Sequence, residues 1–317
     1  MRVLRIRSVR RSLRLKNSVV AVGVFDGVHA AHRAIIAAAV RYARRNRTLC
    51  VVLTFWPHPR GEQSLYSLTH RLRIIEELGV DVCVVVTFTR GFAALSPLGF
   101  VNTILARQLG ACKVFVGENF RFGKNAAGDA ALLTLLAKSA GIGVTVFSRI
   151  MIAGRVVSSS LLRRLITAGK LEAARRMLLR PVSVFGNVVR GSGRGKALGY
   201  PTANIDPHHE VTPPAGIYAV MVVLGRARYQ GLCYIGTRST FAAQKNKGRR
   251  TKKTKKRAPL CCIEVHMLGF TKNIYGKTLE VQFIKKIRGD KKFFSAEALI
   301  RQIKKDIQKA LPLFPAP

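Results

Sequence analysis

A run of closely spaced glycines, followed by two side chains with neutral oxygen atoms, is the stretch of this sequence best suited to chemistry. The glycines are Gly186, Gly191, Gly193, Gly195 and Gly199. Glycine-rich backbone can adopt positive φ angles, which lets several N–H groups point at one bound oxyanion. Thr202 and Asn204 follow, two residues apart, so in an extended chain both face the same side and could contact one hard cation. The pattern predicts a phosphate-binding loop beside a Mg²⁺ site; the alternative is a glycine-rich hairpin with ordinary turn hydrogen bonds.

Two histidines open an alanine-rich stretch that should be helical as far as about residue 45. His29 and His32 are three residues apart, which places both imidazoles on one face of the first helical turn. The helix dipole and the free N–H groups at that end favour a phosphate, and histidine can donate a hydrogen bond to it. The alternative is a pair of exposed helix histidines without a ligand.

A serine cluster and a lone glutamate are the other candidates for chemistry. Ser158, Ser159 and Ser160 precede Arg163, and hydroxyls at a helix start with an arginine one turn on suit a triphosphate. An ordinary serine N-cap is the alternative. Glu264 lies in a run of alternating apolar residues, where a carboxylate needs a reason. That reason is either a catalytic function or a structural pairing with Arg or Lys.

The first half of the chain alternates strands with helices, which predicts a Rossmann-like, doubly wound parallel sheet. Strands are expected over residues 19–25, 51–55, 81–88, 112–117 and 142–149, and helices over 29–45, 69–78, 97–108 and 130–140. Ser96-Pro97 and Gly128-Asp129 are expected to begin the last two helices. Ligands of such sheets bind at the carboxyl ends of the strands, and the polar segments 23–32, 54–59 and 117–124 all follow strands.

The second half predicts a compact antiparallel β-barrel that ends in a helix. Period-two apolar runs cover residues 182–189, 217–224, 229–235, 260–268 and 279–287, and the terminal helix runs from 295 to about 310. Helices over 159–179 join the halves, and Arg180-Pro181 marks the expected boundary. We therefore expect two domains, 1–180 and 181–317.

The chain is strongly basic, with 55 Lys and Arg against 15 Asp and Glu and a net charge of +40 over 317 residues. Such a charge attracts nucleic acid non-specifically, but no nucleic-acid-binding motif accompanies it. Residues 244–257 hold nine Lys and Arg and no acid, and are expected to be a solvated flexible loop. No apolar run is long enough to span a membrane. The six cysteines are expected to be reduced core residues of a cytoplasmic protein. A basic transit peptide at the N-terminus is the alternative, with little to cleave before the strand at 19–25.

Motifs along nearly the whole chain resemble those of bacterial bifunctional riboflavin kinase/FAD synthetases. In the second half these are the run ending in G-Y-P-T-A-N at 204, A-G-I-Y-A-V at 215–220, I-G-T-R-S-T-F at 235–241, I-E-V-H-M-L-G-F at 263–270 and I-R-G-D-K-K-F at 287–293. In the first half they are G-V-F-D-G-V-H at 23–29, T-F-W-P-H-P at 54–59, G-E-N-F-R-F-G at 117–123 and S-S-S-L-L-R at 158–163. The sequence departs from the family pattern at Ala31, which replaces the glycine of H-x-G-H, and at Ser160, Ser239 and Gly269. A basic residue often found near 125–127 is also absent.

The resemblance implies ATP-dependent phosphorylation of riboflavin to FMN, followed by adenylylation of FMN to FAD. The alternative is riboflavin kinase activity alone, with an adenylyltransferase half weakened by Ala31. The implied catalytic residues are Glu264, as general base for the kinase, and His29, His32 and Arg163 for adenylyl transfer. The implied ATP and phosphate contacts are Gly23, Phe25, Asp26, Ser158, Ser159, Ser160, Gly186, Gly191, Gly195 and Gly199, and the implied Mg²⁺ ligands are Thr202 and Asn204. The implied flavin contacts are His58, Pro59, Asn119, Arg121, Phe122, Asp129 and Arg288.

Overall fold

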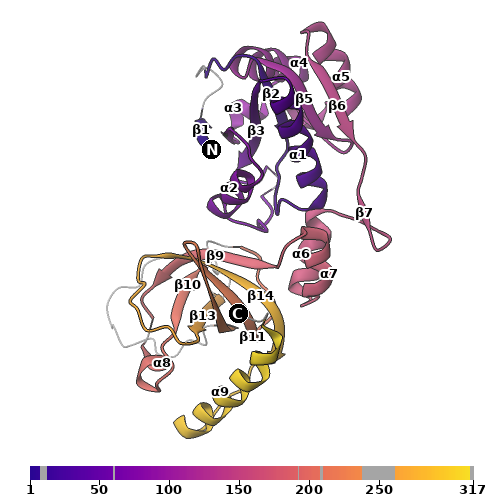
Figure 1. The fold of residues 1–317 in the computed structure, drawn as a ribbon. Helices are drawn as coiled ribbons and strands as arrows, with labels where there is room; N and C mark the ends of the chain where they lie inside the picture. Colours follow the sequence, from indigo (N-terminus) through magenta and orange to yellow (C-terminus); the bar gives the residue numbers. More distant parts are fainter. Residues whose placement is uncertain (8–12, 60, 192, 208–209, 238–260, 315–317) are drawn as a thin grey trace, which may run out of the picture. The chain divides into compact units, whose positions relative to one another are not determined.

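The protein consists of two compact units, each with its own sheet (Figure 1). The computed structural model describes residues 1–7, 13–59, 61–191, 193–207, 210–237 and 261–314. One unit comprises Met1–Arg163 and Arg176–Leu179, and the other Arg164–Arg175 and Arg180–Pro317. The basic segment 244–257, and residues 238–241 of the I-G-T-R-S-T-F motif, lie outside the described residues.

The first unit is built on a parallel sheet of six strands, as the alternating pattern predicts. The strands are β1 (Arg2–Ile6), β2 (Ser18–Val22), β3 (Leu49–Trp56), β4 (Val82–Thr87), β5 (Ala111–Gly117) and β6 (Gly143–Phe147), in the spatial order β1-β4-β3-β2-β5-β6. The central strands β2, β3 and β4 are almost wholly buried, which explains their continuous valine-rich sequences. β1 was not expected; it pairs in parallel with β4 at the edge of the sheet.

Helices flank this sheet. They are α1 (Ala30–Arg45), α2 (Leu68–Glu77), α3 (Arg90–Ala93), α4 (Pro97–Gly99), the π-helix η1 (Phe100–Gln108), the short 3₁₀ turn η2 (Lys124–Ala126) and α5 (Ala130–Ser139). Those at residues 30–45, 68–77, 97–108 and 130–139 lie where they were predicted, whereas α3 and η2 were not expected. Ser96 and Asp129 cap their helices as expected, because their side chains accept hydrogen bonds from the N–H groups of Gly99 and Leu132. The expected helix at 97–108 is therefore present, but most of it has π-helical geometry, which the sequence pattern did not indicate.

The second unit is a closed antiparallel barrel of six strands, as predicted from the period-two apolar runs. The strands are β9 (Ser183–Val189), β10 (Ala203–Asp206), β11 (Gly216–Leu224), β12 (Ala227–Thr237), β13 (Cys261–Met267) and β14 (Thr278–Arg288). Their order around the barrel is β10-β13-β12-β11-β14-β9. The strand β10 was not predicted. It carries Asn204 and pairs with both β9 and β13.

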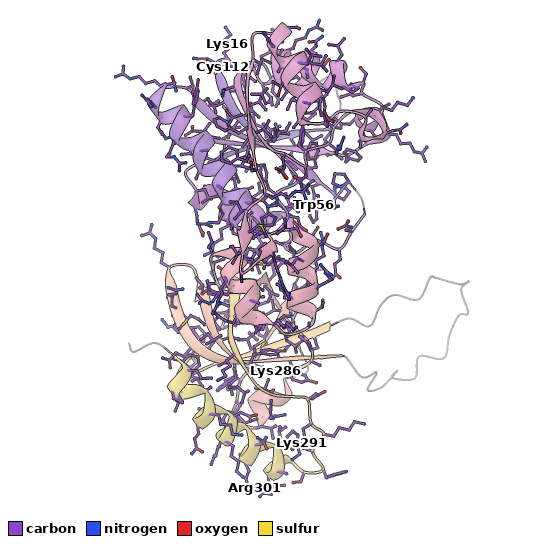
Figure 2. The ribbon with its side chains drawn as sticks, turned by 90° about the vertical axis from the view of Figure 1, so that its right-hand side faces the viewer. Lys16, Trp56, Cys112, Lys286, Lys291 and Arg301 are labelled. Carbon is purple, nitrogen blue, oxygen red and sulfur yellow. The ribbon has the colours of Figure 1, made fainter. Side chains whose placement is uncertain are left out.

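The remaining elements are short or helical. They are the hairpin β7 (Met151–Ile152) and β8 (Arg155–Val156), then α6 (Ser159–Thr167), α7 (Leu171–Leu178), α8 (Arg194–Ala197), α9 (Ala296–Ala310) and η3 (Leu311–Leu313). Exposed basic side chains project from β14, from the segment after it and from α9, as Lys286, Lys291 and Arg301 show (Figure 2). No helix among the described residues combines the length and apolarity that a bilayer crossing requires.

The cysteines follow the prediction in part. Cys50, Cys83 and Cys233 are buried and Cys262 is half-buried, whereas Cys112 is exposed. Cys112 was wrongly expected in the core. The pairing of β2 with β5 shifts register between Ser18 and Val19, so Cys112 is the extra residue of a bulge and has no partner position on β2.

Candidate active sites

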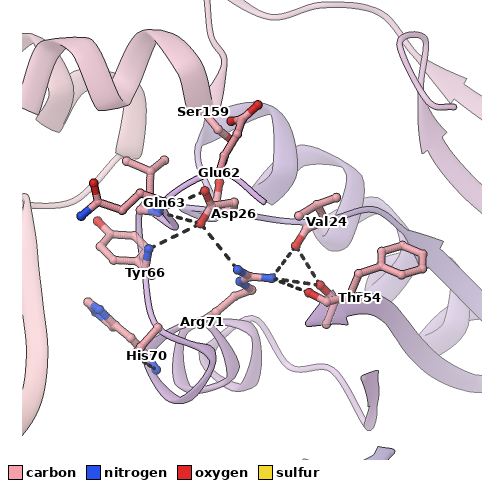
Figure 3. Close-up of polar contacts among 12 residues, drawn as sticks. Val24, Asp26, Thr54, Glu62, Gln63, Tyr66, His70, Arg71 and Ser159 are labelled. Atoms are coloured by element: carbon pink, nitrogen blue, oxygen red, sulfur yellow. Dashed lines mark hydrogen bonds and ion pairs between the residues drawn. The ribbon is translucent and has the colours of Figure 1, made fainter. Parts of the chain in front are cut away.

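In the first unit, Asp26 connects the segments that leave the sheet at the carboxyl ends of β2 and β3 (Figure 3). Its side chain is 1% exposed. The carboxylate accepts hydrogen bonds from the N–H groups of Leu65, at 3.0 and 3.1 Å, and Tyr66, at 3.4 Å. It also accepts a hydrogen bond of 2.7 Å from Nη2 of Arg163. Asp26 therefore joins the segment after β2 to the segment after β3 and to α6.

Arg163, on α6, is held by three groups in this arrangement. Its Nη2 bonds Asp26, its Nε donates to the carbonyl oxygen of Gln63 at 2.7 Å, and its Nη1 pairs with Glu62. The two carboxylates balance most of the positive charge in this part of the site.

The three serines before Arg163 differ in their surroundings. Ser159 donates from Oγ to the carbonyl oxygen of Asp26 at 2.9 Å, so it joins the start of α6 to the same loop. Ser158 accepts a hydrogen bond of 3.3 Å from the N–H of Leu161 in the first turn of α6, as a helix cap does. Ser160 is exposed.

His29 and His32 lie together at the start of α1, as their spacing predicts. Their rings stack with centroids 3.6 Å apart, and the ring of Phe25 meets that of His32 edge-on at 5.3 Å. Within the described part of the chain, Nδ1 of each histidine is buried without a hydrogen-bond partner. Burial lowers the pKa of His29 to about 4, and burial together with the positive charges of His29 and Arg71 lowers that of His32 well below its usual value. Both rings are therefore neutral at pH 7.

This burial predicts that the first unit loses stability in mild acid. The folded-state pKa of His29 lies below its unfolded value of about 6.5, so the unfolded chain takes up the proton first. The stability is complete above pH 6.5 and falls as the pH drops from there toward 4. Between pH 6.5 and 5 we expect a loss of about 2 kcal/mol from this residue. Urea unfolding followed by the fluorescence of Trp56 measures it; His29→Asn should show a flatter dependence, and an identical slope would contradict the assignment.

The segment after β3 carries the predicted flavin contacts His58 and Pro59, both half-buried. Burial lowers the pKa of His58, and the nearby carboxylates of Asp26 and Glu62 oppose that effect in part. The N–H of Gly23, the first residue after β2, donates to the carbonyl oxygen of Leu53 on β3 at 3.1 Å. The segments 23–32 and 54–59 thus meet at the carboxyl ends of β2 and β3, as the sheet-edge rule predicts, and residues 158–163 at the start of α6 contact the first of them.

The segment after β5 holds the other predicted flavin contacts. Asn119 is exposed, and Arg121 forms an ion pair of 3.4 Å with Asp129, the cap of α5. Phe122 is 6% exposed and packs between Phe100 and Phe120, so its ring belongs largely to the hydrophobic core.

Arg71 is a residue of this site that the motifs did not identify. It lies on α2 with none of its side chain exposed, 3.6 Å from Asp26, and its guanidinium stacks 5.5 Å from the ring centroid of Trp56. The sequence did contain an indication that Arg71 is buried. Arg71 stands three and four residues before Ile74 and Ile75, which are buried, so it is a charged residue on the apolar face of its helix.

In the barrel, three polar side chains form a row across neighbouring strands. Glu264 of β13 pairs in register with Asn204 of β10 on one side and with Tyr234 of β12 on the other. Ile263 and Val265 are both 1% exposed and face the barrel core, so Glu264 points to the opposite side. Within the described residues, no ion pair joins Glu264 to Lys or Arg, so the structural alternative for this carboxylate finds no partner there.

The neighbours of this row complete the geometry. Cys262 donates from Sγ toward Glu264 at 3.4 Å and lies 3.8 Å from Oδ1 of Asn204. The hydroxyl of Tyr234 donates to Asp290 at 3.3 Å, and burial, with the charge of Asp290 adding to it, raises the pKa of Tyr234 to about 12.

Two of the loop glycines lie directly against the predicted metal ligands. A Cβ at Gly191 would stand 2.0 Å from Nδ2 of Asn204, and one at Gly195 would stand 3.0 Å from Oγ1 of Thr202 and 2.5 Å from the carbonyl oxygen of Tyr200. Only glycine allows this approach. Gly199 has a positive φ of 80° and open space around it, which suits a turn.

Gly186 has a different reason for its identity. It lies inside β9, where a Cβ would stand 1.9 Å from the carbonyl oxygen of Asp206 on β10. Strand packing therefore explains this glycine without a phosphate.

The oxygens near the loop fit a magnesium ion better than a transition metal. The side chains of Thr202 and Asn204 offer neutral oxygen atoms. Glu264, which pairs in register with Asn204 on the neighbouring strand, adds a carboxylate. Mg²⁺ prefers such ligands and keeps several waters. Among the described residues, no cluster of three His, Cys, Asp or Glu side chains suits a metal.

Arg288, a predicted flavin contact, joins the barrel to its terminal helix. Its Nε donates to both carboxylate oxygens of Asp306 on α9, at 3.1 and 2.9 Å. Asp306 is 1% exposed and also accepts a hydrogen bond of 2.8 Å from Gln302. The guanidinium stacks 5.6 Å from the ring centroid of Phe293. In this arrangement the charge of Arg288 is neutralised by the helix.

Comparison with known proteins assigns a family model to each half. Residues 12–161 match the FAD synthetase model, and residues 178–314 match the riboflavin kinase model. The chain is 32% identical over 304 residues to the bifunctional riboflavin kinase/FMN adenylyltransferase of Escherichia coli K12, covering 93% of this chain and 92% of that protein. It is 34% identical over 309 residues to the protein of the same name from Listeria monocytogenes, covering 94% and 93%. A crystal structure described as a macrolide-efflux protein from Streptococcus pneumoniae is similar with a TM-score of 0.81 and 26% identity, over 98% of this chain and 99% of that one.

Proposed function

The chain belongs to the family of bifunctional riboflavin kinase/FMN adenylyltransferases, and on that premise we propose that it makes FMN and then FAD. The barrel unit phosphorylates riboflavin with ATP, and the parallel-sheet unit transfers the adenylyl group of a second ATP to FMN. The observation that carries the proposal is the register pair of Asn204 and Glu264 beside the glycines at 191 and 195. It combines a carboxylate without a cationic partner among the described residues with a glycine backbone that lies directly against the side chains of Asn204 and Thr202.

In the kinase step, Glu264 acts as the general base. Its carboxylate takes the proton of the riboflavin 5′-hydroxyl, and the hydroxyl oxygen attacks the γ-phosphorus of ATP while ADP leaves. The N–H groups of the glycine loop hold the phosphates, so no side chain is required to bind them. The thiol of Cys262, 3.4 Å from Glu264, helps to hold the carboxylate in place.

Thr202 and Asn204 would hold Mg²⁺ through their side-chain oxygens. When bound, the ion supplies charge neutralisation for the transferring phosphate. The chain itself contributes the position of Asn204, whose side chain lies directly against Gly191 and 3.8 Å from Sγ of Cys262.

In the adenylyl-transfer step, no protein nucleophile is needed. A phosphate oxygen of FMN attacks the α-phosphorus of ATP, and pyrophosphate leaves. His29 and His32 donate hydrogen bonds as neutral imidazoles at the amino end of α1, where the helix dipole also favours negative charge. Arg163 adds positive charge from α6, once a triphosphate competes with Glu62 and Asp26 for its guanidinium.

The second candidate function is riboflavin kinase activity alone. Ala31 favours it, because this residue lies between the two histidines in the first turn of α1 and adds a methyl group where the family has glycine. Under this reading the first unit binds nucleotide poorly, and FMN accumulates.

The test uses the purified full chain with riboflavin, ATP and Mg²⁺, with products separated by chromatography. We expect FMN to appear first and FAD to follow, with ADP and pyrophosphate as the other products. In a second reaction started from FMN, FAD formation tests the first unit by itself. FMN without FAD in both reactions would establish the kinase-only alternative, and the absence of both products would overturn the proposal.

A further inference from the structure

A wholly buried arginine lies beside Asp26 and the segments that leave β2 and β3. Arg71 faces inward from α2, together with the buried side chains of Leu68, Ile74 and Ile75. A guanidinium with no exposed surface must find acceptors inside the protein, because burial of an unpaired charge is costly. The acceptors that it uses define its effect.

One side of the guanidinium connects the two segments that leave the sheet. Nη1 of Arg71 donates to the carbonyl oxygen of Val24 at 2.8 Å and to that of Phe55 at 3.2 Å, and it lies 3.4 Å from Oγ1 of Thr54. Thr54 in turn donates from Oγ1 to the carbonyl oxygen of Val24 at 2.8 Å. Arg71 thus holds the chain after β2 against the chain at the end of β3 (Figure 3).

The other side of the guanidinium faces Asp26. Nη2 lies 3.6 Å from Oδ1 of Asp26, whose second oxygen bonds Arg163 at 2.7 Å. One buried carboxylate is therefore shared between a buried arginine and the arginine proposed to meet the triphosphate. A change at Arg71 reaches Arg163 through a single intervening side chain.

The turn between these contacts and the histidines has a backbone that needs such support. Phe25 and Val28 have φ angles of 51° and 41°, in the left-handed region that residues with a Cβ rarely adopt, and His29 follows immediately. Backbone of this kind persists only where its surroundings determine it, and it gathers at functional sites. The contacts of Arg71 with Val24 and Asp26 lie directly before and within this turn.

We propose that Arg71 is a positioning residue for adenylyl transfer: it fixes the turn at residues 24–28 so that the stacked pair His29–His32 and Arg163 keep one arrangement. The inference rests on the proposed function of the first unit. Arg71 raises the rate of the chemical step because it positions the histidines and Arg163; it does not contribute to the binding of ATP or FMN. Lysine cannot replace it, because one ammonium cannot serve two carbonyls and a carboxylate in the plane that the guanidinium occupies.

The test compares Arg71→Lys with Arg73→Lys in the full chain. Arg73 lies on the same helix, forms an ion pair with Glu77 and is outside the site, so its variant is the matched control. For Arg71→Lys we expect kcat for FMN adenylylation to fall by about 10²-fold, with KM for ATP and FMN within about threefold, because a displacement of about 1 Å has this effect. Riboflavin phosphorylation, measured in the same preparation, should stay within about twofold for both variants.

A second pair of variants tests the same link with less risk to the fold. Thr54→Val removes the hydroxyl that bonds the carbonyl of Val24 and faces Arg71, whereas Thr54→Ser keeps it. We expect Thr54→Val to lower kcat for adenylylation several-fold and Thr54→Ser to restore it. The far-UV circular dichroism spectrum monitors the fold of each variant, because Arg71 lies 5.5 Å from the ring of Trp56 and its replacement alters the emission of that tryptophan directly.

The outcomes separate the two claims. Full adenylylation by Arg71→Lys, or a loss that falls on KM, would overturn the positioning role and leave the proposed function standing. Absence of FAD formation by the unaltered chain would overturn the proposed adenylyl transfer and the role of Arg71 with it. A loss in kcat alone, with an unchanged far-UV circular dichroism spectrum and with near-normal activity of Thr54→Ser in the second pair, supports the proposal.

Discussion

Replacement of Glu264 by glutamine is expected to lower kcat for riboflavin phosphorylation by about 10²-fold or more, because the amide cannot accept the proton of the 5′-hydroxyl. Glutamine keeps the size of the side chain and its place in the row between Asn204 and Tyr234, so the barrel should fold normally. KM for riboflavin and ATP should change little. Initial rates of FMN formation at saturating substrates measure the effect.

Two comparisons make this result specific. FMN supplied to the same variant should be converted to FAD at the rate of the unaltered chain, because the first unit is not changed. Glu297→Gln, an exposed position in the first turn of α9, should leave both activities intact. Normal turnover in Glu264→Gln would remove the general base from the mechanism.

Replacement of His29 by asparagine is expected to lower kcat for FMN adenylylation by about 10²-fold, because one preorganised donor to the developing phosphate charge is lost. His29 is the N-cap residue of α1, and its side chain does not cap the helix. Asparagine is a favoured N-cap, so the helix should form at least as well. FAD formation from FMN and ATP measures the effect.

The same preparation contains the internal control. Riboflavin phosphorylation should remain within about twofold, because phosphoryl transfer takes place in the other unit. Arg41→Ala, an exposed position on α1, should leave both activities unchanged. An undiminished rate of FAD formation in His29→Asn would show that the imidazole of His29 serves packing and not catalysis.

Much of the fold could be predicted because the buried faces of strands and helices determine where apolar residues occur in the sequence. The central strands of the parallel sheet are continuous apolar runs because both of their faces are buried. The strands of the barrel alternate between apolar and polar residues because only one face is buried. The strand β1 was missed because Arg2 and Arg5 made it resemble a basic leader. It lies at the edge of the sheet, where charged side chains can face solvent.

The strand β10 was missed for a different reason. It has only four residues, too few to show a period, and it follows Pro201, which also suits an extended loop. The register pair of Asn204 and Glu264 depends on this strand, so the key geometry of the kinase site could not be derived from spacing alone.

The candidate sites were predictable where they form short motifs and not where they form networks. His29 and His32 lie close in the chain, so helical periodicity was sufficient to place them together. Asp26 and Arg163 are separated by 137 residues, and no property of either residue indicates the other. The contact between them forms where the start of α6 meets the loop after β2, and Ser159 joins the same two segments through the carbonyl oxygen of Asp26.

The two sheets differ in whether they have edge strands. The barrel is closed, whereas the parallel sheet ends at β1 on one side and at β6 on the other. Arg2 and Arg5 give the β1 border positive charge, so two copies approaching there would repel each other. The β6 border, G-V-T-V-F, carries no charge, and its Val146 is 41% exposed. Growth of the sheet into a second molecule, strand upon strand, is therefore opposed at β1 by the charges of the strand itself, whereas at β6 the nearby charge is that of Lys113 on the neighbouring strand, whose Nζ lies 3.5 Å from the carbonyl oxygen of Val144.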